Sequence, residues 1–340
     1  MKKEVYNTDI IIIGAGPVGL FAVFEAGLLK LRCHLIDALP QVGGQLTEIY
    51  PKKPIYDIPG YPSVLAAELV ENLMTQIKPF NPHFTLGERA ESIERLENGH
   101  FLLTTHRKTV IKAPVIFIAG GLGSFEPRKP PIENITHYED RGVEYMVREP
   151  ELYRNKKIVI AGGGDSALDW TIFLADLAQH ITLIHRRSEF RGALDSVEKV
   201  MHLNASGKIK LITQAEVVKL RGEKHLTALD VKHDVEGILL IEADHFIPLF
   251  GLSPKLGPIG EWGLNINKSA IEVNTFDYST SVDGIFAVGD INTYPGKLKL
   301  ILCGFHEATL AVQSAFKIVH PDKKLSFKYT TVTGIEGLTV

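Results

Sequence analysis

Cysteine is scarce in this chain: only Cys33 and Cys303 occur among its 340 residues, far apart in the sequence. The chain therefore has no CxxC-type dithiol, whereas dithiol–disulfide exchange requires two neighbouring thiols. Both cysteines lie in apolar surroundings, so we expect two reduced core residues. This use of cysteine makes a cytoplasmic location the default expectation.

Long apolar runs and strongly basic stretches are missing as well. No run approaches the ~20 apolar residues that cross a bilayer, and residues 1–8 are polar, unlike a secretory signal. The net charge of −3 and the hydrophobic content of 45% are ordinary for a globular enzyme. We expect one large or two smaller domains, with no membrane or nucleic-acid partner.

Residues 9–37 contain the pattern on which the interpretation of the whole chain rests. Four consecutive isoleucines predict a strand buried on both faces, as in a parallel sheet. The turn Gly14-Ala15-Gly16-Pro17-Val18-Gly19 follows, then a helix-like run and a second apolar strand that ends in Asp37. In this context GxGxxG predicts an adenine dinucleotide site.

Each key residue of this motif has a specific physical role in binding a dinucleotide. Gly14 permits the tight turn, Gly16 lets a pyrophosphate approach the backbone, and Gly19 lets helix and strand pack closely. The helix N-terminus offers free N–H groups and the positive end of its dipole. Asp37 can accept hydrogen bonds from both hydroxyls of an adenosine ribose.

The next segments frame this site. The glycine pair before Gln45 is expected to lie against the cofactor, and the proline-rich residues 51–62 predict a fixed loop. We expect a helix over 65–78 and short strands over 84–118 with a hairpin near residues 97–100. The glycine-rich segment 120–123 predicts a domain junction.

The opening pattern then repeats. A strand at 157–161 leads into Gly162-Gly163-Gly164-Asp165-Ser166-Ala167, a helix is expected over 167–177, and a second strand over 181–184. Gly162 and His185 are separated by as many positions as Gly14 and Asp37. The second copy thus places His185-Arg186-Arg187, and soon Arg191, where the first has an acid.

This exchange of charge predicts a different nucleotide. Arginines pair with a 2′-phosphate through charge-assisted hydrogen bonds, whereas a carboxylate would repel it. The second site should therefore prefer NADPH to NADH. The alternative is an ordinary solvated run of charge, and the matched spacing favours the phosphate interpretation.

The last third of the chain is expected to return to the first domain. Short strands are predicted over 208–247 and a junction near 248–254. The strand at 284–288 ends in Gly289-Asp290, and a helix is expected to open at 304–308 and run to about Val319.

The chain resembles the thioredoxin-reductase-like flavoproteins, which have two dinucleotide-binding domains. It carries, in that family's order, GAGPVG at 14–19, GGGDSA at 162–167, HRRSEFR at 185–191 and FAVGD at 286–290. The resemblance implies an α/β fold with two Rossmann-like three-layer domains. It assigns residues 1–121 and 247–340 to a discontinuous FAD domain with a C-terminal tail from about 325, and residues 122–246 to an inserted NADPH domain.

The missing dithiol separates the chain from the thioredoxin reductases within this group. It fits the thioredoxin-reductase-like ferredoxin–NADP(+) reductases, and Tyr50-Pro51-Lys52-Lys53 resembles their Tyr-Pro-Glu-Lys segment. In that subgroup this tyrosine stacks on the flavin ring. A second aromatic, matched here by Tyr329, reaches the opposite face from the neighbouring protomer of a homodimer.

Motif and resemblance together define the expected site. The residues expected to bind FAD are Gly14, Gly16, Pro17, Val18, Gly19, Asp37, Gln45, Tyr50, Phe125, Asp290, Thr330 and Thr331. Those expected to bind NADPH are Gly162, Gly164, Asp165, Ser166, Ala167, His185, Arg186, Arg187 and Arg191. No metal and no acid–base side chain is needed for hydride transfer to a flavin.

The expected activity is electron exchange between NADPH and ferredoxin or flavodoxin. A reductase of flavins, quinones or oxygen would use the same residues, and a nucleotide sensor or scaffold that keeps FAD for structure is the non-enzymatic alternative. Because ferredoxins are usually acidic, docking candidates are basic. They are Lys52, Lys53, Arg128, Lys129, Lys297 and Lys299.

Overall fold

A computed structural model of the chain describes residues 5–123, 126–253, 255–325, 334–335 and 337–338. The chain forms two compact units, the first from residues 1–125 and 254–340 and the second from 126–253. The expected cut at 246/247 would divide strand β18 (His245–Pro248), which pairs with β12 (Lys157–Ala161) inside the second unit. The chain therefore leaves that unit only after this strand.

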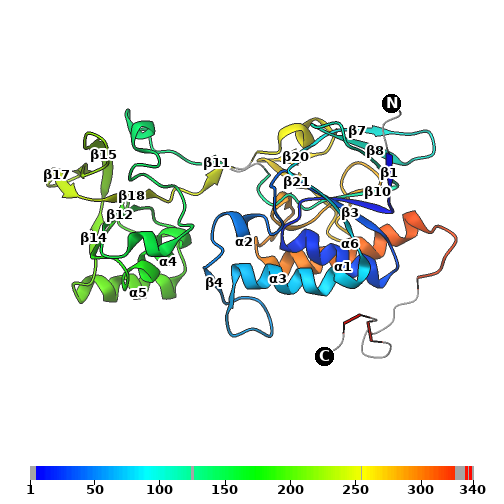
Figure 1. Cartoon of the computed structure of the whole chain (residues 1–340), viewed down its shortest axis with the longest axis horizontal. Helices are drawn as coiled ribbons and strands as arrows, with labels where there is room; N and C mark the ends of the chain where they lie inside the picture. Colours follow the sequence, from blue (N-terminus) through cyan, green and yellow to red (C-terminus); the bar gives the residue numbers. More distant parts are fainter. Residues whose placement is uncertain (1–4, 124–125, 254, 326–333, 336, 339–340) are drawn as a thin grey trace. The chain divides into compact units, whose positions relative to one another are not determined.

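A parallel five-stranded sheet is the centre of the first unit (Figure 1). Its strands, in spatial order, are β22 (Ile285–Ala287), β10 (Val115–Ile118), β2 (Ile10–Ile13), β3 (Cys33–Asp37) and β6 (His83–Leu86). All four isoleucines of β2 are buried, as predicted for a strand covered on both faces. The carboxyl ends of these strands consequently share one edge of the sheet.

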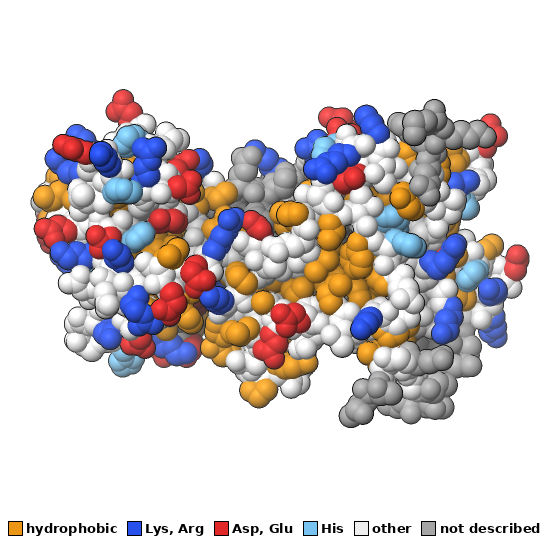
Figure 2. Space-filling model, viewed as in Figure 1, with side chains coloured by type: hydrophobic (Ala, Val, Ile, Leu, Met, Phe, Trp, Pro, Cys, Tyr) orange, Lys and Arg blue, Asp and Glu red, His pale blue; other side chains and the backbone are white. Residues whose placement is uncertain are grey.

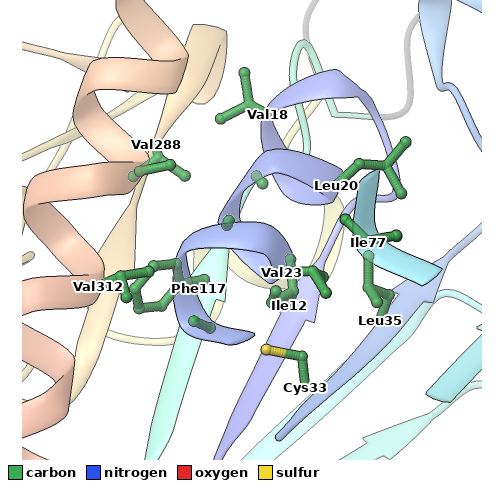
Figure 3. Packing of buried hydrophobic residues seen from close by; sticks show 14 of the residues in the cluster. Ile12, Val18, Leu20, Val23, Cys33, Leu35, Ile77, Phe117, Val288 and Val312 are labelled. Carbon is green, nitrogen blue, oxygen red and sulfur yellow. The ribbon is translucent and has the colours of Figure 1, made fainter. Parts of the chain in front are cut away.

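Alternate residues of β2 enter different cores. Ile10 and Ile12 pack with the helices α1 (Pro17–Leu28), α3 (Ala66–Ile77) and α6 (Ile301–Val319), as Figure 3 shows in part. Ile11 and Ile13 pack on the other face. The partner there is a second sheet of β1 (Val5–Asn7), β9 (Val110–Ala113), β8 (Phe101–Thr105) and β7 (Ala90–Arg95). The unit thus has three layers.

The second unit repeats this plan with fewer strands. Its parallel sheet has the order β14 (Lys210–Thr213), β13 (His180–His185), β12 and β18. Helices α4 (Asp165–Leu174) and α5 (Leu194–Ala205) pack on each other, and an antiparallel sheet adds β15 (Ala215–Arg221), β16 (Ala228–His233) and β17 (Gly237–Glu242). The two Rossmann-like domains expected from the repeat are present.

Shorter elements complete the two units. They are α2 (Gln45–Glu48), β4 (Pro54–Ile55), β5 (Val64–Leu65), β20 (Ile266–Asn267), β21 (Ala270–Glu272) and β23 (Asn292–Thr293) in the first, and β11 (Glu126–Pro127) with β19 (Leu252–Ser253) in the second. Over the ranges that the structure describes, no helix is both long and apolar enough to cross a membrane.

Two expectations about the last helix are wrong. It begins at Ile301 rather than at 304–308, because the apolar residues Ile301 and Leu302 extend its helical pattern toward the N-terminus. Cys33 is a buried core residue as expected, whereas Cys303 in the first turn of this helix is only partly buried. The N-terminus of helix α6 therefore lies at least three residues earlier than the sequence predicts.

One buried histidine makes the stability of the first unit depend on pH. His34 on β3 is 2% exposed, its Nε2 lies 2.8 Å from the Thr85 hydroxyl, and the His83 ring is 5.8 Å away. Burial first, and then the charge of His83, lower the pKa of His34 from 6.5 to about 4. The folded chain thus keeps His34 neutral at a pH where the unfolded chain protonates it.

We predict that this histidine causes a loss of stability on acidification. Between pH 6.5 and 5 the unfolded state binds a proton that the folded state excludes, which costs about 2 kcal/mol. In urea unfolding, His34→Gln should flatten the decline over that window, while His225→Gln at an exposed position should not. An unchanged decline in the His34 variant would contradict the assignment.

Candidate functional site

In the first glycine-rich turn, two glycines are tightly packed against the backbone and a third borders open space. An ideal Cβ at Gly19 would lie 2.0 Å from the Gly14 carbonyl oxygen, and one at Gly14 would lie 2.3 Å from the Ala119 oxygen. A Cβ at Gly16 would meet nothing within 4 Å. Two glycines of the motif are therefore required by the protein's own backbone, whereas the third leaves room beside it.

Helix α1 starts in this turn without a side-chain cap. Its N-cap is Gly16, and Pro17 occupies the first helical position. The unsatisfied N–H groups and the positive end of the helix dipole therefore face the open side of the turn, a natural place for a phosphate. Val18 contributes backbone here, because its side chain is buried against Gly289 and Gly304.

Asp37 holds the turn in shape from the neighbouring strand. One carboxylate oxygen accepts the N–H of Ala15 at 2.7 Å, and the other accepts that of Leu39 at 2.9 Å. Burial raises the pKa of Asp37 despite these hydrogen bonds. Each oxygen keeps a second lone pair, so the carboxylate can still accept from ribose hydroxyls.

The glycine pair before α2, which the sequence predicts to lie against the cofactor, contacts the same glycine-rich turn. Gly43 donates its N–H to the Ala15 carbonyl at 2.8 Å, and a Cβ at Gly44 would be 3.3 Å from the Gly16 Cα. Gln45 begins α2 directly after this contact. The loop thereby forms one wall beside the open position at Gly16.

Tyr50 and Asp290 share an environment near this edge of the sheet. Asp290 lies in the short 3-10 helix η5 (Gly289–Ile291), and burial raises its pKa. Burial, together with the nearby negative charges of Asp290 and Asp57, raises the pKa of Tyr50 to about 12. The phenol therefore stays neutral, and its ring is partly covered by the first unit's core.

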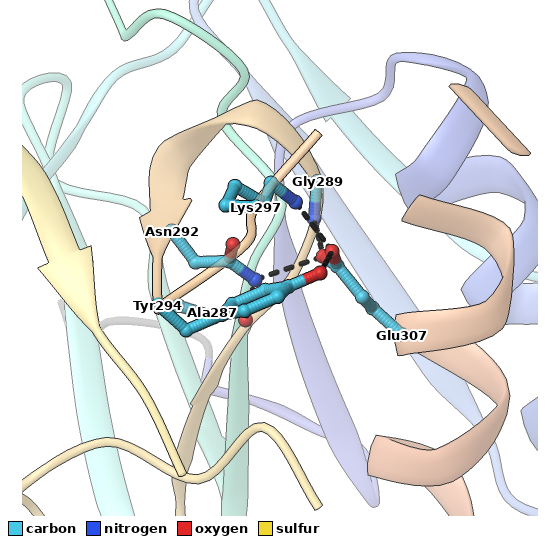
Figure 4. A network of polar contacts seen from close by, with 6 residues as sticks. All are labelled: Ala287, Gly289, Asn292, Tyr294, Lys297 and Glu307. Atoms are coloured by element: carbon cyan, nitrogen blue, oxygen red, sulfur yellow. Dashed lines mark hydrogen bonds and ion pairs between the residues drawn. The ribbon is translucent and has the colours of Figure 1, made fainter. Parts of the chain in front are cut away.

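Lys297 does not belong to any docking surface. Its side chain is 6% exposed and forms an ion pair with Glu307, which is fully buried in α6 (Figure 4). Lys297 is one of the basic docking candidates expected from the sequence, whereas Glu307 is not among the residues expected at the site. The sequence signal that points to Glu307 is a single carboxylate on the buried face of α6, beside the small residues Gly304, Ala308 and Ala311.

The glycine-rich turn of the second unit has the same division of roles. A Cβ at Gly162 would lie 2.7 Å from the Ala167 Cβ and 2.8 Å from the Leu249 oxygen, whereas one at Gly164 would meet nothing within 4 Å. Gly164 is the uncapped N-cap of α4, followed by the exposed residues Asp165 and Ser166. Both domains thus offer an open backbone at one helix N-terminus.

His185 has a different position from the arginines that follow it. Its ring is 5% exposed, stacks on Phe190 with 5.0 Å between centroids, and lies under Gly163, where a Cβ would be 2.0 Å away. Burial lowers the pKa of His185, which keeps the ring neutral. Arg186 and Arg187 are exposed. The buried imidazole therefore packs beneath the turn, whereas the two arginine side chains remain exposed.

Two hydrogen bonds hold the arginine segment to the glycine-rich turn. The N–H of Arg191 donates to the Gly163 carbonyl at 2.8 Å, and that of Ala193 donates to the Asp165 carboxylate at 2.7 Å. Asp165 therefore acts on the protein's own backbone, and the exposed Arg191 side chain is held near the second turn.

Four expected site residues lie outside the described residues: Phe125, Tyr329, Thr330 and Thr331. Among the other expected residues, Asp37 is hydrogen-bonded to the turn at Gly14–Gly19, and His185 and Arg191 contact the turn at Gly162–Gly164.

Comparison with known proteins agrees with this geometry. Residues 8–315 match the family model described as pyridine nucleotide-disulphide oxidoreductase. A ferredoxin–NADP reductase of Flavobacterium johnsoniae is 66% identical over 97% of this chain and 95% of that protein. One of Bradyrhizobium is 51% identical over 97% and 96%.

Among solved structures, the T. acidophilum thioredoxin reductase superposes with a TM-score of 0.80, covering 92% of this chain and 98% of that one, at 23% identity. The Staphylococcus aureus bacillithiol disulfide reductase reaches a TM-score of 0.75 at 18% identity, with 91% and 98% covered. These two likenesses establish the fold.

The chain belongs to the pyridine nucleotide-disulphide oxidoreductase family. Within that class, its curated relatives of more than half identity carry the name ferredoxin–NADP reductase.

Substitutions at Gly16 and Gly19 test which glycine is needed for ligand binding and which for packing. Gly16→Val should leave the thermal midpoint of the apoprotein nearly unchanged but abolish binding of FAD, the dinucleotide predicted for this turn. Gly19→Ala should instead lower the midpoint, because its Cβ collides with the Gly14 carbonyl. Calorimetry and FAD titration separate the two effects. A Gly16 variant that binds FAD like the parent would contradict the open-position assignment.

Proposed function

We propose that the chain is an FAD-dependent ferredoxin–NADP(+) oxidoreductase. The observation that carries the proposal is the pair of matched glycine-rich turns with opposite charges beside them, Asp37 at the first and Arg186 with Arg187 at the second. Relatives 51–66% identical over almost the whole chain are named for this activity. An enzyme that holds one dinucleotide and reacts with another needs two such sites.

FAD fits the first unit. The pyrophosphate would lie beside Gly16 at the α1 N-terminus, where a Cβ has no neighbour, and the ribose would meet Asp37. Asp290 would bind the ribityl–phosphate part, close to Tyr50, which would stack on the flavin ring. Gln45, Phe125, Thr330 and Thr331 are assigned to this cofactor from the family resemblance.

NADPH fits the second unit by the same reasoning. Its pyrophosphate would lie beside Gly164 at the α4 N-terminus, and its 2′-phosphate would pair with Arg186 and Arg187. Arg191 is held close to this turn through its backbone bond to Gly163. The neutral His185 beneath the turn keeps the segment in place.

Bound FAD supplies the redox chemistry, because a flavin accepts a hydride and releases electrons singly. The protein's residues bind and orient the two nucleotides. Helix α6 begins at Ile301, and Gly304 in its first turns packs on Gly289. A helix dipole there stabilises negative charge.

The partner proposed for single-electron exchange is ferredoxin or flavodoxin. Figure 2 shows side chains of both signs interspersed over the visible face, in keeping with the net charge of −3, so docking would use a local basic area. Lys52 and Lys299 remain exposed candidates in the first unit, and Arg128 in the second. Lys129 is ion-paired with Glu139. Lys53 lies 5.8 Å from the Tyr50 ring centroid.

A homodimer is part of the proposal. It rests on the family resemblance, in which Tyr329 of one protomer covers the flavin of the other. Light scattering on the purified holoprotein measures the mass directly, and a monomer would remove this part without affecting the proposed activity.

The competing enzyme activity is reduction of free flavins, quinones or oxygen. Turnover separates it from the proposed activity: NADPH-driven cytochrome c reduction should rise several-fold when the organism's own ferredoxin or flavodoxin is added. Equal rates with and without these proteins would favour the diffusible acceptors. A flavin that NADPH fails to bleach without oxygen would indicate the non-enzymatic sensor or scaffold.

A further inference from the structure

Glu307 is a fully buried carboxylate, a position that is stable only if other groups offset the cost of removing its charge from water. It is 0% exposed and lies on the stripe of α6 formed by Gly304, Ala308, Ala311 and Val312. Removing a carboxylate from water costs several kcal/mol unless hydrogen bonds and opposite charge replace the lost hydration. Its surroundings on the helix are apolar, so the compensation comes from elsewhere in the fold.

Within the described residues, the hydrogen bonds and the ion pair of the Glu307 carboxylate come from one segment, residues 289–297 (Figure 4). One carboxylate oxygen of Glu307 accepts the Gly289 N–H at 2.7 Å and the Asn292 Nδ2 at 2.8 Å. The other accepts the Tyr294 hydroxyl at 2.8 Å and the Lys297 ammonium. With two donors on each oxygen, the carboxylate has every lone pair occupied.

Residues 289–297 donate hydrogen bonds to Glu307 even though one polar atom of the segment is left without a partner among the described residues. Asn292 donates its second N–H to the Ala287 carbonyl at 2.8 Å, which fixes the orientation of the amide. Its oxygen is then buried and lacks a hydrogen-bond partner within the described part of the chain. The donors toward Glu307 therefore determine how the segment is arranged.

The held segment carries Asp290, the acid at the carboxyl end of β22. Gly289 has a φ of +79°, and a Cβ there would meet Val18 at 3.3 Å, so the turn is pressed onto the first turn of α1. The hydrogen bond from Gly289 to Glu307 fixes this turn from behind. Asp290 is the next residue in the chain, and its negative charge lies close enough to Tyr50 to raise the pKa of the phenol.

We propose that Glu307 is a positioning residue for the cofactor, with Lys297 as its neutralising partner. It holds the Gly289–Asp290 turn in the geometry that binds the ribityl–phosphate of FAD. The inference rests on the proposed function only in that FAD is the ligand. Neither Glu307 nor Lys297 has to touch the flavin.

The test compares FAD binding to apoprotein variants. Glu307→Gln removes one acceptor of the four-donor set and leaves the Lys297 charge buried, so the dissociation constant for FAD should rise at least about tenfold. The uncompensated cation should also raise the midpoint potential of bound FAD, since it stabilises the reduced, more negative form. Glu71→Gln, at an exposed position of α3, is the matched control and should change neither quantity.

A double variant keeps the test decisive if Glu307→Gln fails to fold. Lys297→Met combined with Glu307→Gln removes both charges of the pair, so it should fold and return the potential toward the parent value. Its FAD dissociation constant should remain raised, because the Gly289 N–H has still lost its carboxylate. Parent-like affinity in the double variant would overturn the proposal. A parent protein that does not bind FAD would instead refute the proposed function.

Discussion

The contact between Gly14 and Gly19 is the constraint on which the site depends. With only hydrogen on Gly19, helix α1 starts directly above the end of β2, against the Gly14 carbonyl. The helix N-terminus is thereby brought to the carboxyl edge of the sheet, where β3 delivers Asp37 and β22 delivers Asp290. Helix α6 packs on the same helix N-terminus through the contact of Gly304 with Val18.

The second unit repeats the backbone plan of the first glycine-rich turn beside different charges. Its turn keeps an open glycine at the helix N-terminus, but the strand after it ends in a buried histidine followed by two exposed arginines. The distinction between the domains is therefore electrostatic, since the backbone plan is shared. With only two cysteines, far apart in the sequence, the chain has no CxxC-type dithiol for disulfide exchange.

The sequence predicted those features that follow from local pattern. The isoleucine strand, both glycine-rich turns, the hairpin near residues 97–100 and the strands over 208–247 all depend on neighbouring residues, and the structure contains them. The start of α6 was misplaced because Gly304 looked like a boundary, although it is buried inside the helix against Val18. Local pattern cannot reveal such a contact.

Long-range pairing escaped the sequence for the same reason. Lys297 looked like a surface charge until its partner, Glu307, was found ten positions later on the buried face of a helix. His185 looked like the first of three basic ligands, yet its ring fills the space under Gly163. In both cases the role of the side chain depends on its burial, which the local sequence pattern does not predict.

The most direct measurement is the anaerobic reduction of the bound flavin by NADPH and by NADH, in the parent and in the Arg186→Ala/Arg187→Ala variant. We expect a parent that strongly prefers NADPH and a variant in which that preference falls at least about tenfold, with the rate for NADH little changed. A variant that keeps the full preference, or a purified protein that binds no FAD, would contradict it.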